Sequence, residues 1–318
     1  MTEQLDKTVV GIRPYGAVRI VGEDRVDLLH RLSTNDLQPL SEPGRVQTTL
    51  FTSEKGKLVD WVWALSTPDA IVLQCSSGRA PDLVQWIDKF VIMEDVGAED
   101  HSETHRWVVC VGPDAARAAG LEDLPPKGES VLAHGVRWFR GLDAFGTRLE
   151  GIATAEDAEA AVQRALDAGA EKADEAKWER LRVRAGVPAS TAEFEQPINP
   201  LELRLAKDTI HWNKGCYIGQ EVIARMDTYN KIARQMMGFE AGREALGGVP
   251  ERGVRLKADG RVLGKVTSAI EDGDVVRGLA VVKTAGAQAG ALATLDVAGE
   301  PTVALSDRPF WSTAAQSS

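Results

Sequence analysis

Residues 214–221 read Lys-Gly-Cys-Tyr-Ile-Gly-Gln-Glu, and no other stretch of the chain is as informative. Cys216 lies beside Lys214, is flanked by Gly215 and Gly219, and precedes a run of residues that predicts a helix. Glycine lets the backbone turn tightly and leaves the sulfur uncrowded, while a cation and a helix N-terminus favour the thiolate form of cysteine. The sequence therefore predicts a functional thiol at Cys216. A small buried cysteine without chemistry is the alternative interpretation.

The composition of the chain is that of an ordinary globular protein with more than one domain. Of its 318 residues, 43% are hydrophobic and 26% are charged, so a sizeable core can form. Three widely spaced cysteines are too few for a disulfide framework or a zinc site. The polar start of the chain excludes a secretory signal, and no apolar run is long enough to cross a membrane. We therefore expect a cytoplasmic protein without membrane contact.

The charge of the chain is unevenly distributed. The formal net charge of −10 argues against general nucleic-acid binding. The segment 204–234 departs from this, because its six basic and three acidic residues give it a net charge of +3. A basic island around the cysteine motif suits an anionic small molecule or a phosphate group. Ordinary scatter of charge over a solvated surface explains the same pattern.

The first 241 residues mix predicted strands and helices. A strand over 16–21 precedes a helix in which Leu28, Leu29 and Leu32 form an apolar stripe. Strands over 47–52 and 58–65 are joined by a turn that contains glycine, which is typical of a hairpin. Further helices are predicted over 81–90, 154–168 and 174–186.

The last part of the chain changes in character after Gly238. Short strands are predicted between 254 and 297, separated by Asp-Gly pairs at 259–260 and 272–273 that favour hairpin turns. This pattern predicts an antiparallel sheet or a small barrel. Because 242–248 is rich in glycine, we place the domain boundary there. The predicted domains are an α+β region over 1–241 and a small β-barrel over 242–318.

Asp60 is a second candidate for chemistry. It is the only charged residue in the run 58–65, which reads Leu-Val-Asp-Trp-Val-Trp-Ala-Leu. A carboxylate within such a strand either has an internal hydrogen-bond donor or faces a ligand pocket. The sequence leaves both interpretations open.

Three glutamates, Glu193, Glu195 and Glu202, flank the stretch Pro-Ile-Asn-Pro at 197–200. The two oxygens of a carboxylate can accept two parallel N–H bonds, which is the pattern offered by a guanidine-like or pterin edge. Trp212 follows in the chain, and an indole face can stack on a heteroaromatic ring. Loop positions without a ligand are the alternative interpretation for these residues.

Histidine gives little support to hydrolytic chemistry. His211 lies five residues before Cys216 and could act as its base only if the loop folds back. The sequence has no phosphate-binding glycine loop, no dinucleotide fingerprint and no cluster with metal-ligand spacing. A Cys–His hydrolase is therefore a minor alternative, and no metal site is expected.

Residues 214–221, followed by Ala224-Arg225, resemble the signature of the YgfZ group of folate-binding proteins, relatives of the glycine-cleavage T-protein, an aminomethyltransferase. The similarity extends along nearly the whole chain and includes the stretches 22–36, 51–60, 182–188, 197–201 and 264–268. It implies an α+β fold of three lobes, with antiparallel sheets, flanking helices and a C-terminal β-barrel domain. It also implies a central channel that binds tetrahydrofolate or its methylene or polyglutamyl derivative.

The resemblance also implies folate-binding roles for residues of this chain. In T-proteins a glutamate holds the pterin, and Glu202 matches it best by position, with Glu193 as the second choice. A basic residue that contacts folate falls at Lys231 or Arg234. Trp212 joins this set as the predicted stacking residue.

The same resemblance bears on which reaction is carried out. T-proteins carry two consecutive acidic residues in the hairpin strand, one of them catalytic, whereas here Asp60 is followed by Trp61. T-proteins lack the cysteine, while the YgfZ group has it and is linked to iron–sulfur cluster assembly or repair and to tRNA methylthiolation. The resemblance therefore implies a folate-binding accessory protein for iron–sulfur enzymes, with Cys216 as its reactive centre.

Two alternatives stay open. One is a folate-dependent aminomethyltransferase in which Asp60 is catalytic. The other is a folate-regulated binding module in which Cys216 is structural. The expected partners are folate and, through the resemblance, iron–sulfur assembly proteins or iron–sulfur enzymes, without direct contact to nucleic acid.

Overall fold

The computed structural model describes residues 5–142, 147–195 and 197–307 of the chain. The chain forms two compact units. Unit 1 comprises Met1–Asp174 and Asp208–Gln220, and unit 2 comprises Glu175–Lys207 and Glu221–Ser318. Within the described ranges, no helix is long and apolar enough to span a membrane.

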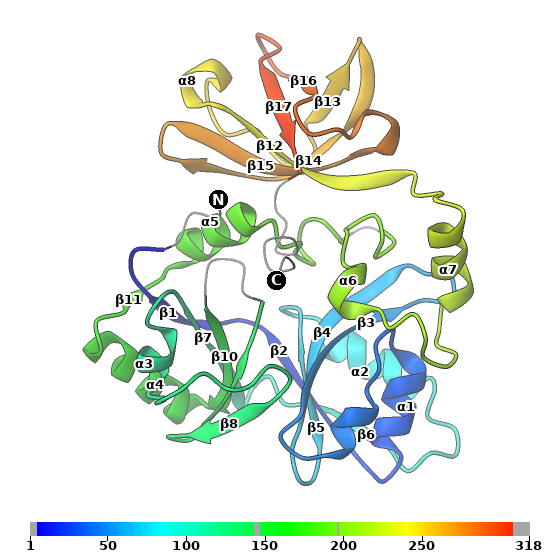
Figure 1. Ribbon diagram of the computed structural model, residues 1–318, viewed down its shortest axis with the longest axis vertical. Helices are drawn as coiled ribbons and strands as arrows, with labels where there is room; N and C mark the ends of the chain where they lie inside the picture. The colour runs from blue at the N-terminus through cyan, green and yellow to red at the C-terminus, as the bar shows by residue number, and fades with distance from the viewer. Residues whose placement is uncertain (1–4, 143–146, 196, 308–318) are drawn as a thin grey trace, which may run out of the picture. The chain divides into compact units, whose positions relative to one another are not determined.

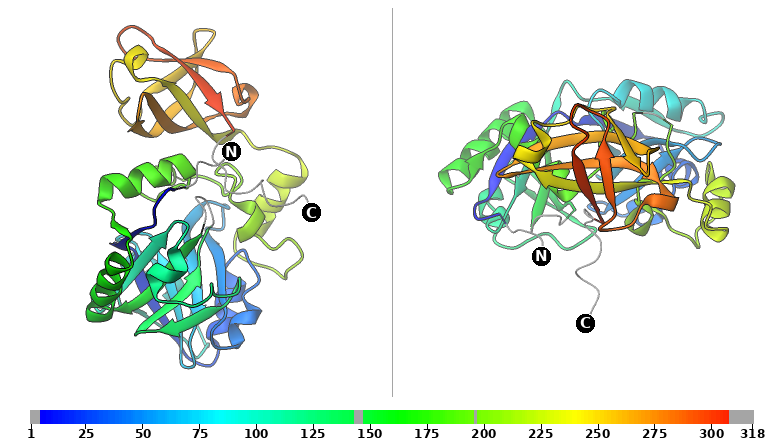
Figure 2. Two further views of the ribbon diagram at one scale, coloured as in Figure 1. Left: turned by 60° about the vertical axis from the view of Figure 1, so that its left-hand side comes forward. Right: turned by 90° about the horizontal axis from the view of Figure 1, so that it is seen from above.

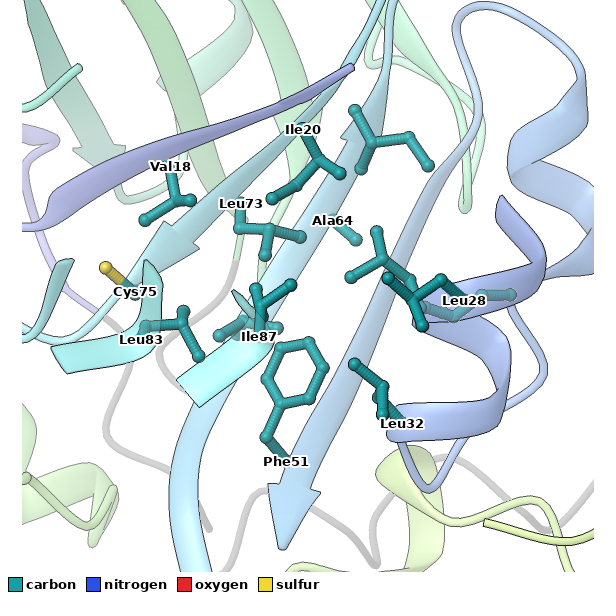
Figure 3. Close-up of a cluster of buried hydrophobic side chains, with 14 of the residues drawn as sticks. Val18, Ile20, Leu28, Leu32, Phe51, Ala64, Leu73, Cys75, Leu83 and Ile87 are labelled. Carbon is teal, nitrogen blue, oxygen red and sulfur yellow. The ribbon is translucent and has the colours of Figure 1, made fainter. Parts of the chain in front are cut away.

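One half of unit 1 is an antiparallel five-stranded sheet with two helices on one face. Its strands, in spatial order, are β3 (Val46–Thr52), β4 (Leu58–Ser66), β5 (Ile71–Cys75), β2 (Gly16–Val21) and β6 (Gly97–Asp100). Helices α1 (Arg25–Leu32) and α2 (Ala80–Asp88) bury their apolar stripes against this sheet. Figure 3 shows Leu28 and Leu32 of α1 and Leu83 and Ile87 of α2 directed towards strand residues such as Phe51. The predicted hairpin and leucine stripe are confirmed.

The other half of unit 1 is a six-stranded sheet. Its spatial order is β11 (Glu171–Lys172), β1 (Val9–Arg13), β7 (His105–Val111), β10 (Arg148–Thr154), β9 (Val136–Arg140) and β8 (Ser130–Ala133). All pairs are antiparallel except β11 with β1. Helices α3 (Ala115–Ala119) and α4 (Ala155–Asp167) cover one face of this sheet (Figure 1). Thr154 caps α4 by accepting the Asp157 N–H at 3.2 Å, as the sequence predicts.

The two sheets of unit 1 share an apolar core, which we call the inter-sheet core. It contains Ala17, Val46 and Leu65 of the five-stranded sheet and Trp107, Phe139 and Ile152 of the six-stranded sheet. Side chains alternate between the faces of a strand, so Trp107 faces this core while Val108 faces the helices. Unit 1 is therefore built as helices, sheet, sheet and helices.

Unit 2 contains a closed six-stranded barrel (Figure 2). Its strands follow in the order β12 (Arg234–Gly242), β15 (Val275–Lys283), β14 (Arg261–Asp272), β13 (Arg255–Ala258), β16 (Leu292–Leu295) and β17 (Thr302–Ser306). Asp259 and Gly260 both have positive φ in the turn between β13 and β14, which is the conformation that Asp-Gly favours. The predicted barrel is confirmed. Unit 2 differs from the predicted domain over 242–318, because it also includes Glu175–Lys207 and its second segment begins at Glu221. Strand β12 belongs to the barrel.

The remaining helices lie between the sheets of unit 1 and the barrel in sequence. They are α5 (Glu175–Ala185), α6 (Ala206–Thr209) and α7 (Gln220–Thr228), with the short α8 (Arg243–Leu246) following β12. Helix α5 stops before Gly186, whose φ of +58° ends the helix in the left-handed region. Helix α7 begins at Gln220, within the cysteine motif, and confirms that a helix follows Cys216 closely in the chain.

Candidate functional site

Lys214 anchors the start of the cysteine motif in unit 1. Its Nζ donates hydrogen bonds to the carbonyl oxygens of His30, Ser33 and Asn35, at 2.5, 2.8 and 2.7 Å. These carbonyls lie at and just beyond the C-terminal end of α1, where unpaired carbonyls and the helix dipole favour a cation. Desolvation lowers the pKa of Lys214 to about 8, partly opposed by the charge of Asp36, so the side chain is charged at neutral pH. The lysine ammonium therefore serves to fix the loop to α1.

The second half of the motif is anchored to the β3–β4 hairpin. The Thr52 hydroxyl donates to the Ile218 carbonyl at 2.6 Å, and the Ile218 side chain packs against the core under α1 and α2. Gly219 has a φ of +83°, and a Cβ there would lie 2.5 Å from the Ser53 carbonyl oxygen. Only glycine fits this position without displacing the backbone of the hairpin.

Tyr217 lies in the chain between the two anchored parts of the motif, and its side chain is buried. It is 8% exposed, and burial raises the pKa of its hydroxyl to about 12. The ammonium of Lys214 lies 5.6 Å from the centre of the ring, within the range of a cation–π contact. The Tyr217 N–H donates to Oε1 of Gln220, the first residue of α7, at 3.3 Å.

Cys216 is exposed on the loop that these contacts hold in place. It lies on the irregular segment between the anchors, four residues before α7, and its side chain is exposed. A Cβ added at the neighbouring Gly215 would meet no atom within 4 Å, so the space beside the cysteine is open. The structure therefore contains an exposed thiol without crowding by Gly215, and its functional role stays a prediction.

The other two cysteines lie in the sheets of unit 1. Cys75 and Cys110 are 1% and 0% exposed. Burial raises the pKa of Cys75 far above its ordinary value and that of Cys110 to about 12, with further increases from nearby carboxylates. Both cysteines are small core residues without available thiolate.

Asp60, also in unit 1, is buried on the face of β4 that α1 and α2 cover. Its carboxylate accepts the backbone N–H groups of Trp61 and Ser76, at 2.9 and 3.0 Å, and the Ser76 hydroxyl at 2.6 Å. Burial raises the pKa of this carboxyl, while the three hydrogen bonds and the charge of Arg79 act in the opposite direction. Of the two interpretations that the sequence left open, internal pairing describes the observed contacts.

Glu193 lies in unit 2 within a buried polar network. It accepts hydrogen bonds from Nη1 of Arg182, the N–H of Ala189 and the hydroxyls of Thr267 and Ser268, at 2.7–2.9 Å. Its side chain has no exposed surface. These four donors join α5, the segment after it and β14, so the observed contacts of Glu193 are those of a structural residue.

Glu202 and Arg234 form a bidentate ion pair in unit 2. The guanidinium of Arg234 donates from Nε to Oε1 and from Nη2 to Oε2 of Glu202, at 3.0 and 3.1 Å. The Asn199 N–H adds a third hydrogen bond at 3.0 Å. The glutamate is 4% exposed, whereas the arginine side chain is 45% exposed. The carboxylate is thus held in place and presents both oxygens to a planar, partly solvated donor.

The two remaining predicted folate residues are exposed. Trp212 is 44% exposed on the segment of unit 1 that leads into the cysteine motif. Lys231 follows α7 in unit 2, and its ammonium lies 5.6 Å from the centre of the Tyr229 ring. Their assigned roles in folate binding stay predictions.

The predicted site residues fall into both units. Asp60, Trp212 and Cys216 belong to unit 1, whereas Glu193, Glu202, Lys231 and Arg234 belong to unit 2. Sequence reasoning missed three residues that hold the candidate site residues in place. Thr52 holds the cysteine motif, Ser76 holds Asp60, and Arg182 holds Glu193. Thr52 and Ser76 carry a weak signal, because each is a small hydroxyl residue at or just past the end of an apolar strand.

Comparison with known sequences identifies relatives that match most of the chain, although no protein-family model matches it. A chloroplastic protein of Arabidopsis thaliana whose name assigns it to the transferases is 28% identical over 92% of this chain and 69% of its own length. The mitochondrial iron–sulfur cluster assembly factor IBA57 of Mus musculus is 27% identical over 90% and 84%. The tRNA-modifying protein YgfZ of Hamiltonella defensa is 24% identical over 85% and 81%.

Comparison with solved structures confirms the fold that the sequence predicts. The aminomethyltransferase of the glycine cleavage system from Bartonella henselae matches 97% of this chain and 87% of its own length, with a TM-score of 0.80 and 17% sequence identity. The α+β fold with antiparallel sheets and a C-terminal barrel is therefore that of the T-protein. Sequence and fold together show that the chain belongs to the aminomethyltransferase superfamily and is a homologue of the YgfZ and IBA57 proteins.

Proposed function

We propose that this protein is a tetrahydrofolate-binding accessory protein that supports iron–sulfur cluster assembly or repair, with Cys216 as its reactive centre. The observation that carries the proposal is the construction of the motif. Lys214, Tyr217, Ile218 and Gly219 are all engaged in holding the loop, while the thiol is exposed. Such a loop presents one nucleophilic sulfur to another molecule.

The names of two relatives support the same proposal. The mouse relative is an iron–sulfur cluster assembly factor, and the Hamiltonella relative is a tRNA-modifying protein. We therefore propose iron–sulfur assembly proteins or iron–sulfur enzymes as partners, including enzymes of iron–sulfur-dependent tRNA modification. The thiol would meet these proteins at their surface, because the loop that carries it is exposed.

The two acceptor oxygens of Glu202 fit the paired donors of a pterin. Its carboxylate already accepts two parallel N–H bonds from the Arg234 guanidinium, and the guanidine-like edge of a pterin offers the same pair of donors. Arg234 is half-exposed and can turn away, which would leave it as a cation for the carboxylates of folate. Lys231 of the same unit joins the proposed folate set, and Trp212 of unit 1 stays a predicted stacking residue. When bound, tetrahydrofolate would supply a carrier for a one-carbon unit.

Calorimetric titration with tetrahydrofolate tests the folate part of the proposal. We expect saturable binding by the wild-type protein and a loss of at least tenfold in affinity for Glu202→Ala, because a charge-assisted pair contributes about 1.5–3 kcal/mol. Glu195→Ala, on the same segment, is the matched control and should bind as the wild type does. Absence of binding by the wild-type protein would refute the proposed folate site.

Aminomethyl transfer is the second candidate, and it depends on Asp60. The supporting observation is that burial raises the pKa of this carboxyl, because perturbed carboxyl groups are found often at sites of acid–base chemistry. Formation of methylene-tetrahydrofolate from an aminomethyl donor, abolished by Asp60→Asn, would establish this function. No turnover with lipoyl-bound or methylamine donors would exclude it.

A further inference from the structure

A cleft of about 310 Å³ lies in unit 1, apart from the residues described above. Its lining includes Arg19, Asp69, His101, His105 and Arg137. These residues come from β2, the turn before β5, the segment between β6 and β7, the start of β7, and β9. The cleft therefore draws charged and imidazole side chains from both sheets of the unit.

Strand register shows why these side chains converge. Ile152 of β10 lies opposite both Trp107 of β7 and Arg137 of β9, so the three share one face of the six-stranded sheet. His105 is two residues from Trp107 and lies on that face as well. Trp107 and Ile152 belong to the inter-sheet core. Arg137 and His105 therefore lie on the face of the sheet that forms this core, where they add polar groups.

The five-stranded sheet supplies the opposite wall. Arg19 of β2 pairs with Val72 of β5, and Val72 packs against the inter-sheet core. Directly paired residues share a face, so Arg19 also points towards the six-stranded sheet. Two guanidinium groups thus approach the same cleft from opposite sheets.

The two arginines differ in their partners. Nη2 of Arg19 lies 2.6 Å from Oδ2 of Asp69, and Glu99 lies 4.0 Å away on its other side. The side chain of Arg137, a half-buried residue, has no hydrogen-bond or ion-pair partner among the described residues. With neutral histidines, the lining carries a net charge of +1 from Arg19, Arg137 and Asp69.

The imidazoles add further hydrogen-bonding groups. Nδ1 of His105 contacts the Thr104 hydroxyl at 3.0 Å, which leaves Nε2 for another partner. Nε2 of His101 pairs with Glu99 at 3.1 Å, and its Nδ1 is buried without a partner among the described residues. The two rings lie 5.5 Å apart.

We propose that this cleft binds a small molecule through a phosphate or carboxylate group held by Arg137 and His105. A half-buried guanidinium without a counter-ion is available to an oxyanion, which satisfies its planar pair of donors. The Arg19–Asp69 pair fixes the opposite wall of the cleft. The volume lies at the lower end of the range for ligand pockets, so the ligand is a small anion or a short phosphorylated or carboxylated compound.

Histidine NMR on the wild-type protein tests the proposal without any substitution. The chain has five histidines, of which His101 and His105 line the cleft, while His30, His134 and His211 serve as internal controls. We expect titration with inorganic phosphate, at fixed pH and ionic strength, to shift the imidazole signals of the first two alone. A parallel titration with acetate separates a phosphate site from a carboxylate site. The proposal is overturned if neither anion shifts the His101 and His105 signals at about 50 mM, where even a weak site would be occupied.

Substitution of the unpaired arginine provides the second test. Arg137→Gln should weaken binding of the active anion by about tenfold or more, because a charge-assisted hydrogen bond is lost. Arg261→Gln, at an exposed position of the barrel, is the matched control and should leave the affinity unchanged. Arg137→Lys keeps the charge and should bind with intermediate affinity, which provides a second reading if the glutamine variant is unstable. Equal affinity of the wild-type protein and both Arg137 variants would refute the assignment.

Discussion

Cys216 and Asp60 are the two residues for which the sequence predicts catalysis, and the structure places them in opposite settings. The thiol is exposed on a loop whose neighbouring side chains are all engaged in anchoring it. The carboxylate is 1% exposed inside a strand, and it accepts hydrogen bonds from three internal donors. The Cys216 thiol is thus available to another molecule, whereas the Asp60 carboxylate forms hydrogen bonds within the fold.

The largest expected effect is a difference in thiol reactivity. In the native protein, a thiol-specific disulfide reagent should modify one cysteine quickly, and in denaturant it should modify all three. Cys75 and Cys110 react only after local opening, which should slow them by several orders of magnitude relative to Cys216. Cys216→Ala should abolish the fast phase. Fast modification of two or three thiols in the native protein would contradict the assignment of Cys216 as the one accessible cysteine of the three.

Substitution of Lys214 tests whether the ammonium anchors the loop or only supplies charge near the thiol. Both Lys214→Met and Lys214→Arg should lower the free energy of unfolding by about 3 kcal/mol, because hydrogen bonds from a charged group are lost. A guanidinium cannot converge three N–H groups on carbonyls that surround a single nitrogen. Urea unfolding measures both variants, with the exposed Lys231→Met as control. An arginine variant as stable as the wild-type protein would favour the charge alone.

The two glycines of the motif provide a matched pair. Gly219→Ala should cost about 2 kcal/mol or more, because its φ is positive and the new Cβ would meet the Ser53 carbonyl. Gly215→Ala should change stability by less than about 0.5 kcal/mol, because nothing lies within 4 Å of the new Cβ. Thermal unfolding of both variants checks this. Equal losses would mean that the second anchor does not fix the loop.

The buried carboxyl of Asp60 should make the free energy of unfolding depend on pH. Burial raises its pKa, so the native state binds the proton more tightly than the unfolded state, whose ordinary pKa is 3.8. Its contribution to stability is full below that value and is lost as pH rises through the native pKa. Relative to Asp60→Asn, the free energy of unfolding should therefore fall by up to about 1.4 kcal/mol per pH unit in this window. Urea unfolding of both proteins from about pH 4 upwards measures the difference. Parallel curves would contradict the assignment.

Local patterns in the sequence were enough to predict several elements of the fold. The leucine stripe of α1, the glycine hairpin between β3 and β4, and the Asp-Gly turn between β13 and β14 each follow from residues close together in the chain. Packing of the two sheets of unit 1 could not be predicted in this way. Trp107 and Ala17 meet in the inter-sheet core only after both sheets have formed.

The site shows the same limit. The sequence predicted an uncrowded sulfur at Cys216, because the glycines that flank it are close in the chain. It did not predict the role of Lys214, whose three acceptors are backbone carbonyls about 180 positions earlier in the chain and carry no side-chain signal. The pairing of Glu202 with Arg234 joins residues 32 positions apart, on either side of α6 and α7, so no local pattern indicated it.

The central claim is that Cys216 is the functional group and Asp60 a structural one. Cells that lack this protein, complemented with Cys216→Ala, Asp60→Asn or the buried control Cys110→Ala, allow a direct test through the activity of iron–sulfur enzymes at matched protein levels. We predict that Cys216→Ala gives the activity of cells without the protein, while the other two variants restore it to the extent that they fold. Normal activity with Cys216→Ala, or loss confined to well-folded Asp60→Asn, would contradict the claim.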